Sequence, residues 1–169
     1  MSIPFASFEH EISAVFDTET LAIQVTHHGK TWQSLPGFQP YFEYLPLEQR
    51  RDSQASSHDN QTACNFTGER ILLVSAGERE HIPWQTGFGQ GVRSIFRQFQ
   101  RAGKPIPLEL ETRLWIEAAN GVLHFELIPL ADDSGLLRLM APAPFELPGR
   151  EAKSYTVLPM MQGCLIPSN

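Results

Sequence analysis

The sequence predicts an all-β protein, an antiparallel β-sandwich with room for one short helix. Short runs of β-branched and aromatic residues recur between turn-forming residues, and the two longest runs alternate apolar and polar side chains. With 169 residues, of which 41% are hydrophobic, the chain is long enough to bury a core of its own. We therefore expect a single sandwich domain over residues 1–169.

The first strands are expected to form a meander. Residues 10–16 and 21–26 are short β-type runs, and the polar tetrad at 17–20 between them predicts a hairpin. A second turn is expected at 27–30, because it contains a glycine that can adopt positive φ. It leads into a third short strand at 31–34.

The middle of the chain is less regular. Residues 48–61 are polar and aperiodic, which predicts a flexible surface loop, and β character resumes at 62–66 and 70–75. Residues 92–99 place apolar side chains at i, i+3, i+4 and i+7, the spacing of a helix, so helix and strand both remain open. We favour a strand there, because the segments around it are β-type.

Two longer strands, 108–118 and 122–130, are expected to pair through Asn120-Gly121, a strong hairpin signal. Their alternation predicts one buried and one solvated face. The expected core residues are Leu108, Leu110, Thr112, Leu114, Ile116, Leu123, Phe125 and Leu127, opposite Glu109, Glu111, Arg113, Trp115, Glu117, His124 and Glu126.

Composition excludes several classes of function. A net charge of −6, with one basic grouping at Arg93, Arg97 and Arg101, argues against a nucleic-acid partner. No apolar run is long enough to span a membrane and no signal peptide is evident, so a cytoplasmic protein is expected. Cys64 and Cys164 lack the spacing of a disulfide framework or a metal site, and no cofactor is expected.

Two groups of titratable residues could carry acid–base chemistry. Glu109 and Glu111 share a strand face, as a glycosidase pair would, but beside Arg113 we interpret them as part of a solvated charged stripe. His124 and Glu126 could open a sugar ring, yet nothing else in the sequence converges on them, so exposed cross-strand pairing is preferred. No catalytic residue is assigned.

Glycines, histidines and tryptophans offer further candidates. His27-His28 is interpreted as part of a turn, because neighbouring strand residues face opposite ways. The segment 87–91, GFGQG, lacks the phosphate-loop pattern and is expected to let backbones approach closely. Trp32 is expected in the core, whereas Trp84 could be either a core residue or a surface that stacks on a sugar.

The last residues, 155–169, read as an apolar strand, a turn and a second apolar strand. Chain ends are usually polar and loosely held. We therefore expect these strands to be integral to the sandwich, and the chain to be truncated before a further domain. Leu158 and Leu165 are expected to be core residues, and Leu35 to matter less.

Several segments together resemble a known group of enzymes. Residues 29–36, GKTWQSLP, resemble a G-x-x-W-x-S-x-P element early in the N-terminal β-sandwich of endo-α-N-acetylgalactosaminidase-like glycoside hydrolases, and residues 158–167, LPMMQGCLIP, are similar to the strand-turn-strand that leads into the catalytic barrel. The glycine loop followed by Val92-Arg93-Ser94 fits the same layout.

This resemblance implies a galactose-mutarotase-like fold of the supersandwich type and a non-catalytic domain that supports a following TIM barrel and can lend a loop to its substrate cleft. The implied partners are a carbohydrate and the C-terminal catalytic domain of the same polypeptide. The residues selected for carbohydrate contact are Trp84, Trp115, Arg93 and Gln162. The alternative is a free-standing carbohydrate-binding or aldose-epimerase-like sandwich.

Overall fold

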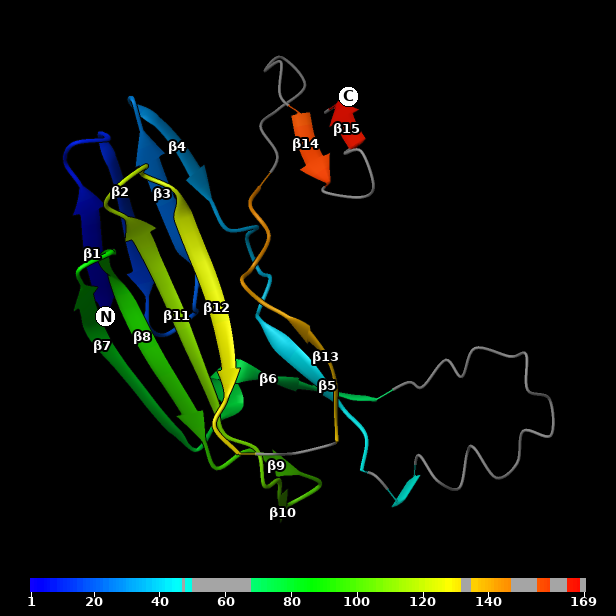
Figure 1. Ribbon diagram of the computed structural model, residues 1–169. Helices are drawn as coiled ribbons and strands as arrows, with labels where there is room; N and C mark the ends of the chain where they lie inside the picture. Colours follow the sequence, from blue (N-terminus) through cyan, green and yellow to red (C-terminus); the bar gives the residue numbers. More distant parts are fainter. Residues whose placement is uncertain (47, 50–67, 132–134, 147–154, 159–163, 168–169) are drawn as a thin grey trace.

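A four-stranded meander begins the chain and forms one layer of a sandwich (Figure 1). The computed structural model describes residues 1–46, 48–49, 68–131, 135–146, 155–158 and 164–167. The meander has the order β1-β2-β3-β4, and its strands are β1 (Ser2–Ser7), β2 (Ile12–Asp17), β3 (Ile23–His27) and β4 (Lys30–Gln33).

The second layer is an antiparallel sheet of the order β12-β11-β8-β7, and β1 packs against its strands β8 and β11. It consists of β7 (Glu78–Thr86), β8 (Gly89–Arg97), β11 (Leu110–Glu117) and β12 (Leu123–Pro129). The segment 92–99, where helical spacing competed with strand context, therefore lies mostly in a strand, as expected. A strand wins because β8 pairs on both sides and is buried on both faces.

Smaller elements complete the described chain. A three-stranded sheet of the order β13-β5-β6 contains β5 (Tyr41–Tyr44), β6 (Glu69–Leu72) and β13 (Leu136–Met140); β9 (Gln100–Arg101) pairs with β10 (Lys104–Pro105), and a 3₁₀ turn spans Leu73–Ser75. The predicted all-β antiparallel sandwich is confirmed. The strands β1, β5, β7 and β13 were not predicted, because their residues lack a clear alternation or turn signal in the sequence.

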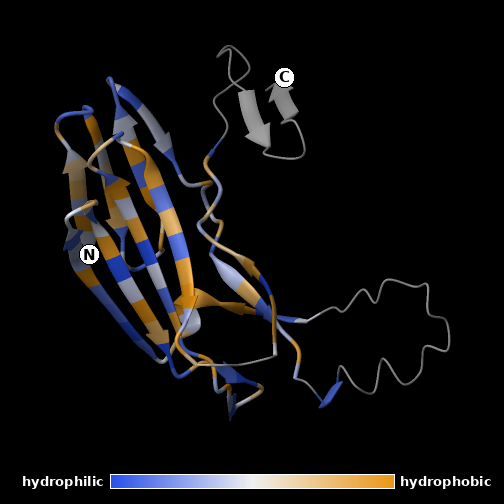
Figure 2. Cartoon of the chain, in the orientation of Figure 1, coloured by the Kyte–Doolittle hydropathy of each residue, from blue (hydrophilic) through white to orange (hydrophobic). Residues whose placement is uncertain are grey.

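The core lies between the layers. Ile3, Phe5 and Phe16 from the meander meet Val92, Phe96 and Leu114 from the second sheet, and each is at most 7% exposed. Figure 2 shows the matching alternation of apolar and polar residues along β11. Each such side chain contributes about 1.5–3 kcal/mol through burial. The expected core face of 108–127 is confirmed, with Leu123, Phe125 and Leu127 packed against the cluster and partly buried.

Three hairpins use the same kind of connection. In each, a four-residue loop ends on a residue with positive φ, namely Glu11 (φ 50°), Leu21 (φ 61°) and Gly121 (φ 69°). The predicted hairpins at 17–20 and at Asn120-Gly121 are thus confirmed. Leu21 tolerates this conformation, which is rare for a bulky residue, because its side chain is buried in the core.

A tight two-residue turn, His28-Gly29, joins β3 to β4. Both residues have positive φ (47° and 73°), the type I′ geometry that matches the twist of the flanking strands. The expected turn at 27–30 is therefore confirmed.

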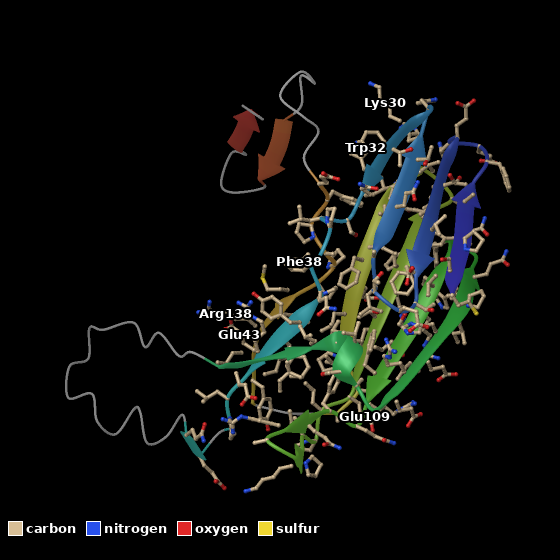
Figure 3. All side chains as sticks on the ribbon, turned by 180° about the vertical axis from the view of Figure 1, so that it is seen from behind. Lys30, Trp32, Phe38, Glu43, Glu109 and Arg138 are labelled. Carbon is tan, nitrogen blue, oxygen red and sulfur yellow. The ribbon has the colours of Figure 1, made fainter. Side chains whose placement is uncertain are left out.

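Trp32 is not a core residue, and this prediction is wrong. It is 37% exposed on β4, which is an edge strand in which all four residues are exposed (Figure 3). The buried residue nearby is Ser34, 7% exposed, whose hydroxyl oxygen accepts the Ile23 N–H at 2.8 Å. Ser34 also donates its own N–H to the Ile23 carbonyl at 2.8 Å, so it fixes the exit of the chain from the meander.

The C-terminal strands β14 (Tyr155–Leu158) and β15 (Cys164–Pro167) form the predicted hairpin. They pair with each other in a two-stranded sheet, separate from both layers of the sandwich. That these strands are integral to the sandwich, with Leu158 and Leu165 as core residues, stays a prediction, because their side chains lie outside what the structure describes. The flexible loop predicted at 48–61 lies almost entirely outside the described residues, as does the strand predicted at 62–66.

The glycines after the β7–β8 turn allow close contact between strands. A Cβ atom on Gly89 would overlap the Ile116 carbonyl oxygen, and one on Gly91 would overlap the Leu114 carbonyl oxygen. A Cβ atom on Gly87, in the turn itself, would meet nothing. The expected backbone role of this segment is confirmed and belongs to Gly89 and Gly91.

His81 is an inward-facing polar residue of the edge strand β7. Its Nδ1 lies 2.8 Å from the Ser94 hydroxyl, and its Nε2 is buried without a partner in the described chain. The ring centroids of Phe16 and Phe96 each lie 5.7 Å from the ring centroid of His81. Burial lowers the pKa of His81 below 6.5, because it disfavours the charged imidazolium. The positive charge of the nearby Arg79 lowers this pKa further, and the carboxylate of Glu19 raises it by a smaller amount.

No helix among the described residues is long and apolar enough to cross a membrane.

The Gly91→Ala variant is expected to lose about 3 kcal/mol of unfolding free energy, at the upper end of overpacking costs, because β8 and β11 must separate. Gly87→Ala, the matched control in open space, should stay within about 0.5 kcal/mol of the parent. Urea denaturation measures both; equal stabilities for the two variants would contradict the close-approach role.

A second prediction concerns pH. Because the folded-state pKa of His81 lies below its unfolded value of 6.5, the folded protein binds fewer protons than the unfolded chain at mildly acidic pH. The stability linked to this residue is fully present above pH 6.5 and declines as the pH falls through the folded-state pKa. Denaturation curves across this range should show a slope that His81→Phe reduces; an unchanged slope would assign it to other groups.

Candidate functional site

The candidate site lies on the outer face of the β12-β11-β8-β7 sheet, which is turned away from the core and carries aromatic and charged side chains. One row of cross-strand partners runs over all four strands: Trp84 pairs with Gly91, Gly91 with Trp115, and Trp115 with His124. We call these four residues the aromatic row. Because Gly91 has no side chain, the two indoles meet over β8.

The rings of the aromatic row are in direct contact. The ring centroids of Trp84 and Trp115 lie 5.4 Å apart at an interplanar angle of 74°, an edge-to-face arrangement. His124 stacks on Trp115 at 4.9 Å and 11°. Such pairs stabilise their geometry by about 0.5–1.5 kcal/mol beyond burial, so the row is held in place before any ligand arrives.

A cluster of ion pairs lies next to the aromatic row. The carboxylate of Glu111 accepts hydrogen bonds from Arg93 Nη2 at 2.6 Å and Arg113 Nε at 2.7 Å. Arg113 also approaches Glu126, with Nη1 3.5 Å from Oε2, and its Cζ lies 5.5 Å from the centroid of the Trp84 ring. We call Arg93, Glu111, Arg113 and Glu126 the ion cluster.

Glu111 is the buried centre of the ion cluster. Its side chain is 2% exposed although it faces away from the core, because the two arginines and neighbouring side chains cover it. The hydrogen bond from Arg93 lowers the pKa of Glu111 below 4.5 and outweighs burial, with Arg113 acting in the same direction. In turn, Glu111 raises the pKa of Arg93. Both groups therefore stay charged.

A second polar contact closes the aromatic row at β12. His124 Nε2 lies 2.9 Å from Glu117 Oε2, and Asn120 Nδ2 donates to the same oxygen at 2.8 Å. The hydrogen bond from Asn120, then that from His124, lowers the pKa of Glu117. The imidazole is thus fixed both by stacking and by a carboxylate.

The residues selected from the sequence are largely brought together. Trp84, Trp115 and Arg93 lie on the same outer face, in adjacent rows of the sheet, whereas Gln162 lies outside the described residues. Sequence reasoning assigned no site role to Arg113, which links the ion cluster to the indoles. The alternation along 108–118 placed it on this face, but only the strand register shows which residues are its neighbours.

The charged stripe at Glu109 and Glu111 needs one correction. Glu109 is 45% exposed and pairs with Arg97 at 3.2 Å, but Glu111 is buried and not solvated as expected. His124 and Glu126 form the cross-strand pairings that were expected: His124 pairs with Glu117, and Glu126 pairs with Arg113.

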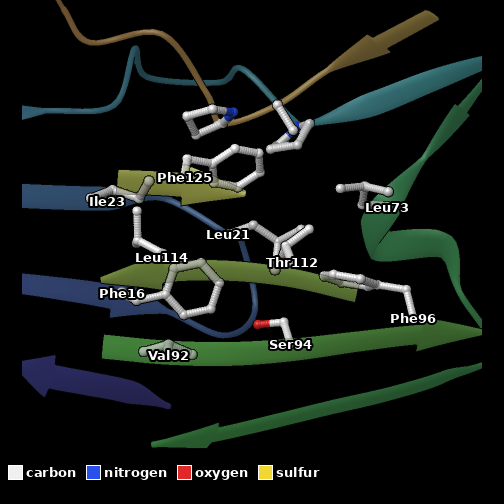
Figure 4. A pocket seen from close by; sticks show the side chains of 13 residues that line it. Phe16, Leu21, Ile23, Leu73, Val92, Ser94, Phe96, Thr112, Leu114 and Phe125 are labelled. Carbon is white, nitrogen blue, oxygen red and sulfur yellow. The ribbon is translucent and has the colours of Figure 1, made fainter. Parts of the chain in front are cut away.

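Two hollows lie elsewhere in the described chain. The interior cavity between the layers holds only about 20 Å³ and is lined by core residues such as Phe16, Leu114 and Phe125 (Figure 4), so it has room for about one water. A polar groove lies at the end of the sandwich that carries the β1–β2, β3–β4 and β11–β12 connections, which we call the loop end. It is lined by Glu9, His10, Glu11, Ile12, His27, His28, Asn120 and Gly121. Within the described chain, no group of His, Cys, Asp or Glu has the arrangement of a metal site.

Comparison with solved structures shows similarity to the α-N-acetylgalactosaminidase NagBb from Bifidobacterium bifidum, a glycoside hydrolase. The alignment with its GalNAc complex has a TM-score of 0.70 and 26% identity over 99% of this chain, and that with its Gal-NHAc-DNJ complex has a TM-score of 0.71 and 26% identity over 98%. A quadruple mutant gives 0.70 and 25% over 98%.

In all three, this chain covers only 22% of the enzyme's length. This chain therefore aligns with one part of a larger glycoside hydrolase. No protein-family model matches the sequence, and no curated protein is significantly similar to it.

Glu111→Gln is expected to lower the unfolding free energy by about 2–3 kcal/mol at neutral pH, because a buried charged acceptor of two arginines is lost. Glu109→Gln, at an exposed pair, should cost less than about 1 kcal/mol. Since the folded-state pKa of Glu111 lies below 4.5, its stabilising effect is present above pH 4.5 and is lost as the pH falls through that pKa. Denaturation of both variants at neutral and acidic pH tests this; a Glu111→Gln variant as stable as the parent would contradict it.

Proposed function

We propose that this chain is a non-catalytic accessory domain of a glycoside hydrolase, one β-sandwich over residues 1–169 that precedes and supports a catalytic barrel. The observation that carries the proposal is the coverage: 98–99% of this chain aligns with 22% of NagBb, so most of that enzyme lies outside the alignment. A galactose-mutarotase-like relationship, a cytoplasmic location and a role beside the substrate cleft belong to the same proposal.

The carboxylates of the outer face support a non-catalytic role. Glycosidases need one carboxyl group with a raised pKa as the acid and a second, ionised one near it. Glu111 and Glu117 instead have lowered pKa values, and Glu109 and Glu126 are paired with arginines. These four carboxylates therefore offer fixed charges and hydrogen-bond acceptors rather than a proton donor.

Contact with a further domain is favoured at the loop end of the sandwich. Phe8, in the β1–β2 loop, is 88% exposed, and Phe88, in the β7–β8 turn, is 78% exposed. A groove lined by Phe8, Thr86, Gly89 and Ala118 lies between these connections. We propose that the catalytic domain of the same polypeptide covers this apolar end, because exposed aromatic side chains of this size gain most from burial at an interface.

The alternative is a free-standing carbohydrate-binding sandwich, and the aromatic row favours it. Trp84 and Arg93 lie on the outer sheet face beside Trp115, where an indole and a guanidinium group can contact a sugar. An aldose-epimerase activity is less well supported, because His124 and Glu126 each have another partner and do not converge.

The residues encoded after Asn169 test the two possibilities. Several hundred residues with alternating strand and helix patterns would support the accessory domain. A stop codon directly after Asn169 would overturn it in favour of the free-standing protein.

The 169-residue chain is expected to show no turnover of p-nitrophenyl N-acetyl-α-galactosaminide, because we identify no acid–base pair among the described residues of its outer face. A chromogenic assay measures this, with the full-length NagBb enzyme as the positive control. Turnover that is abolished in Glu109→Gln, Glu111→Gln or Glu126→Gln would overturn the non-catalytic proposal.

A further inference from the structure

We propose that Trp84 is the stacking surface of a subsite for a neutral pyranose, and that Trp115 and His124 form its fixed backing. This inference deepens the proposed function and rests on it for the class of ligand. It differs from a general sugar-binding face in assigning the contact to one indole and in excluding anionic sugars.

Trp115 is covered by its neighbours. His124 lies on the adjacent strand β12 and stacks nearly parallel to Trp115, so the normal of the Trp115 ring points across the strands. Trp84 reaches Trp115 from the opposite side, over Gly91, at 74° to it. Because Trp84 lies on the side of Trp115 opposite His124, a sugar would meet a neighbouring ring on both sides of Trp115.

Trp84 has an aromatic neighbour on one side only among the described residues, because it lies on the edge strand. Its ring contacts Trp115, and the Arg113 guanidinium approaches it at 5.5 Å. Within the described chain, no further ring or cation contacts Trp84, which is half-buried on the edge strand β7. The apolar C–H face of a pyranose packs on such an indole, in the way that aromatic faces accept positively polarised edges.

The ion cluster supplies hydrogen-bonding groups beside this face. The side chains of Arg93 and Arg113 are 33% and 32% exposed, and their hydrogen bonds to Glu111 leave other N–H groups free to donate to sugar hydroxyls. Glu126, with a side chain that is 47% exposed, can accept from a hydroxyl. Because Glu111 holds both guanidinium groups, these donors are positioned in advance.

The charge of the outer face selects for neutral ligands. The three arginines of the described face, Arg93, Arg97 and Arg113, are outnumbered by six carboxylates: Glu78, Glu80, Glu109, Glu111, Glu117 and Glu126. Each arginine is already paired with a carboxylate. An anionic sugar would thus meet a net negative face and no unpaired arginine.

Titration of the chain with N-acetylgalactosamine, followed by the three indole N–H signals in NMR, tests the proposal. The signals are assigned with Trp84→Ala, Trp115→Phe and Trp32→Ala. We expect the Trp84 signal to shift most, and Trp84→Ala to weaken binding about tenfold, as the loss of one aromatic contact implies. Trp32→Ala is the matched control, because it removes an exposed indole from the other layer and should leave the affinity unchanged.

Glucuronic acid in the same titration should bind at least about tenfold more weakly, and circular dichroism verifies that the variants fold. The proposal is overturned if neither sugar shifts any indole signal at tens of millimolar, if Trp115 or Trp32 responds in place of Trp84, or if glucuronic acid binds as well as the neutral sugar. Should Trp84→Ala fail to fold, the shift of the Trp84 signal in the parent decides. These outcomes do not depend on what is encoded after Asn169, so a failure here leaves the accessory-domain proposal standing.

Discussion

The register of β8 between β7 and β11 decides which residues enter the core and which form the outer face. A strand exposes alternate residues on opposite faces, so a slip of one residue would exchange the two sides of the sheet. In the observed register, Val92 and Phe96 enter the core while Arg93 faces outward beside Arg113. Gly89 and Gly91 fix this register, because the β11 backbone approaches them too closely for any side chain.

The same register builds the outer face. Gly91 leaves a gap between two indoles, and Trp84 and Trp115 fill it from opposite strands. Two residues further along, Arg93 reaches Glu111, a carboxylate buried on the side of the sheet that has no second layer. Two guanidinium groups, rather than water, surround the Glu111 carboxylate, and their charge-assisted hydrogen bonds hold the side chains of this face in place. In our proposals the polar outer face contacts a sugar, whereas the exposed phenylalanines Phe8 and Phe88 contact a protein domain.

An accessory domain needs one surface for its partner domain and can use another for a ligand. Here the end with Phe8 and Phe88 and the polar outer face of the β12-β11-β8-β7 sheet are proposed for these two roles. The part of NagBb outside the alignment is more than three times as long as the aligned part, since this chain covers 22% of it. A domain that makes up so small a share can act by orienting or extending a cleft, without supplying the reacting groups. The lowered pKa values of Glu111 and Glu117 are consistent with that role, because they keep both carboxylates ionised.

Local periodicity and turn chemistry were enough to predict the fold class, the hairpins at 17–20 and at Asn120-Gly121, and the core face of 108–127. The sequence also indicated Trp84, Trp115 and Arg93 as candidates. The exposure of Trp32, the burial of Glu111 and the contact of Arg113 with both an indole and the ion cluster became visible only in the folded chain. Burial and partnership of these residues depend on which strands lie beside them, and strand order is set by contacts between residues far apart in the sequence.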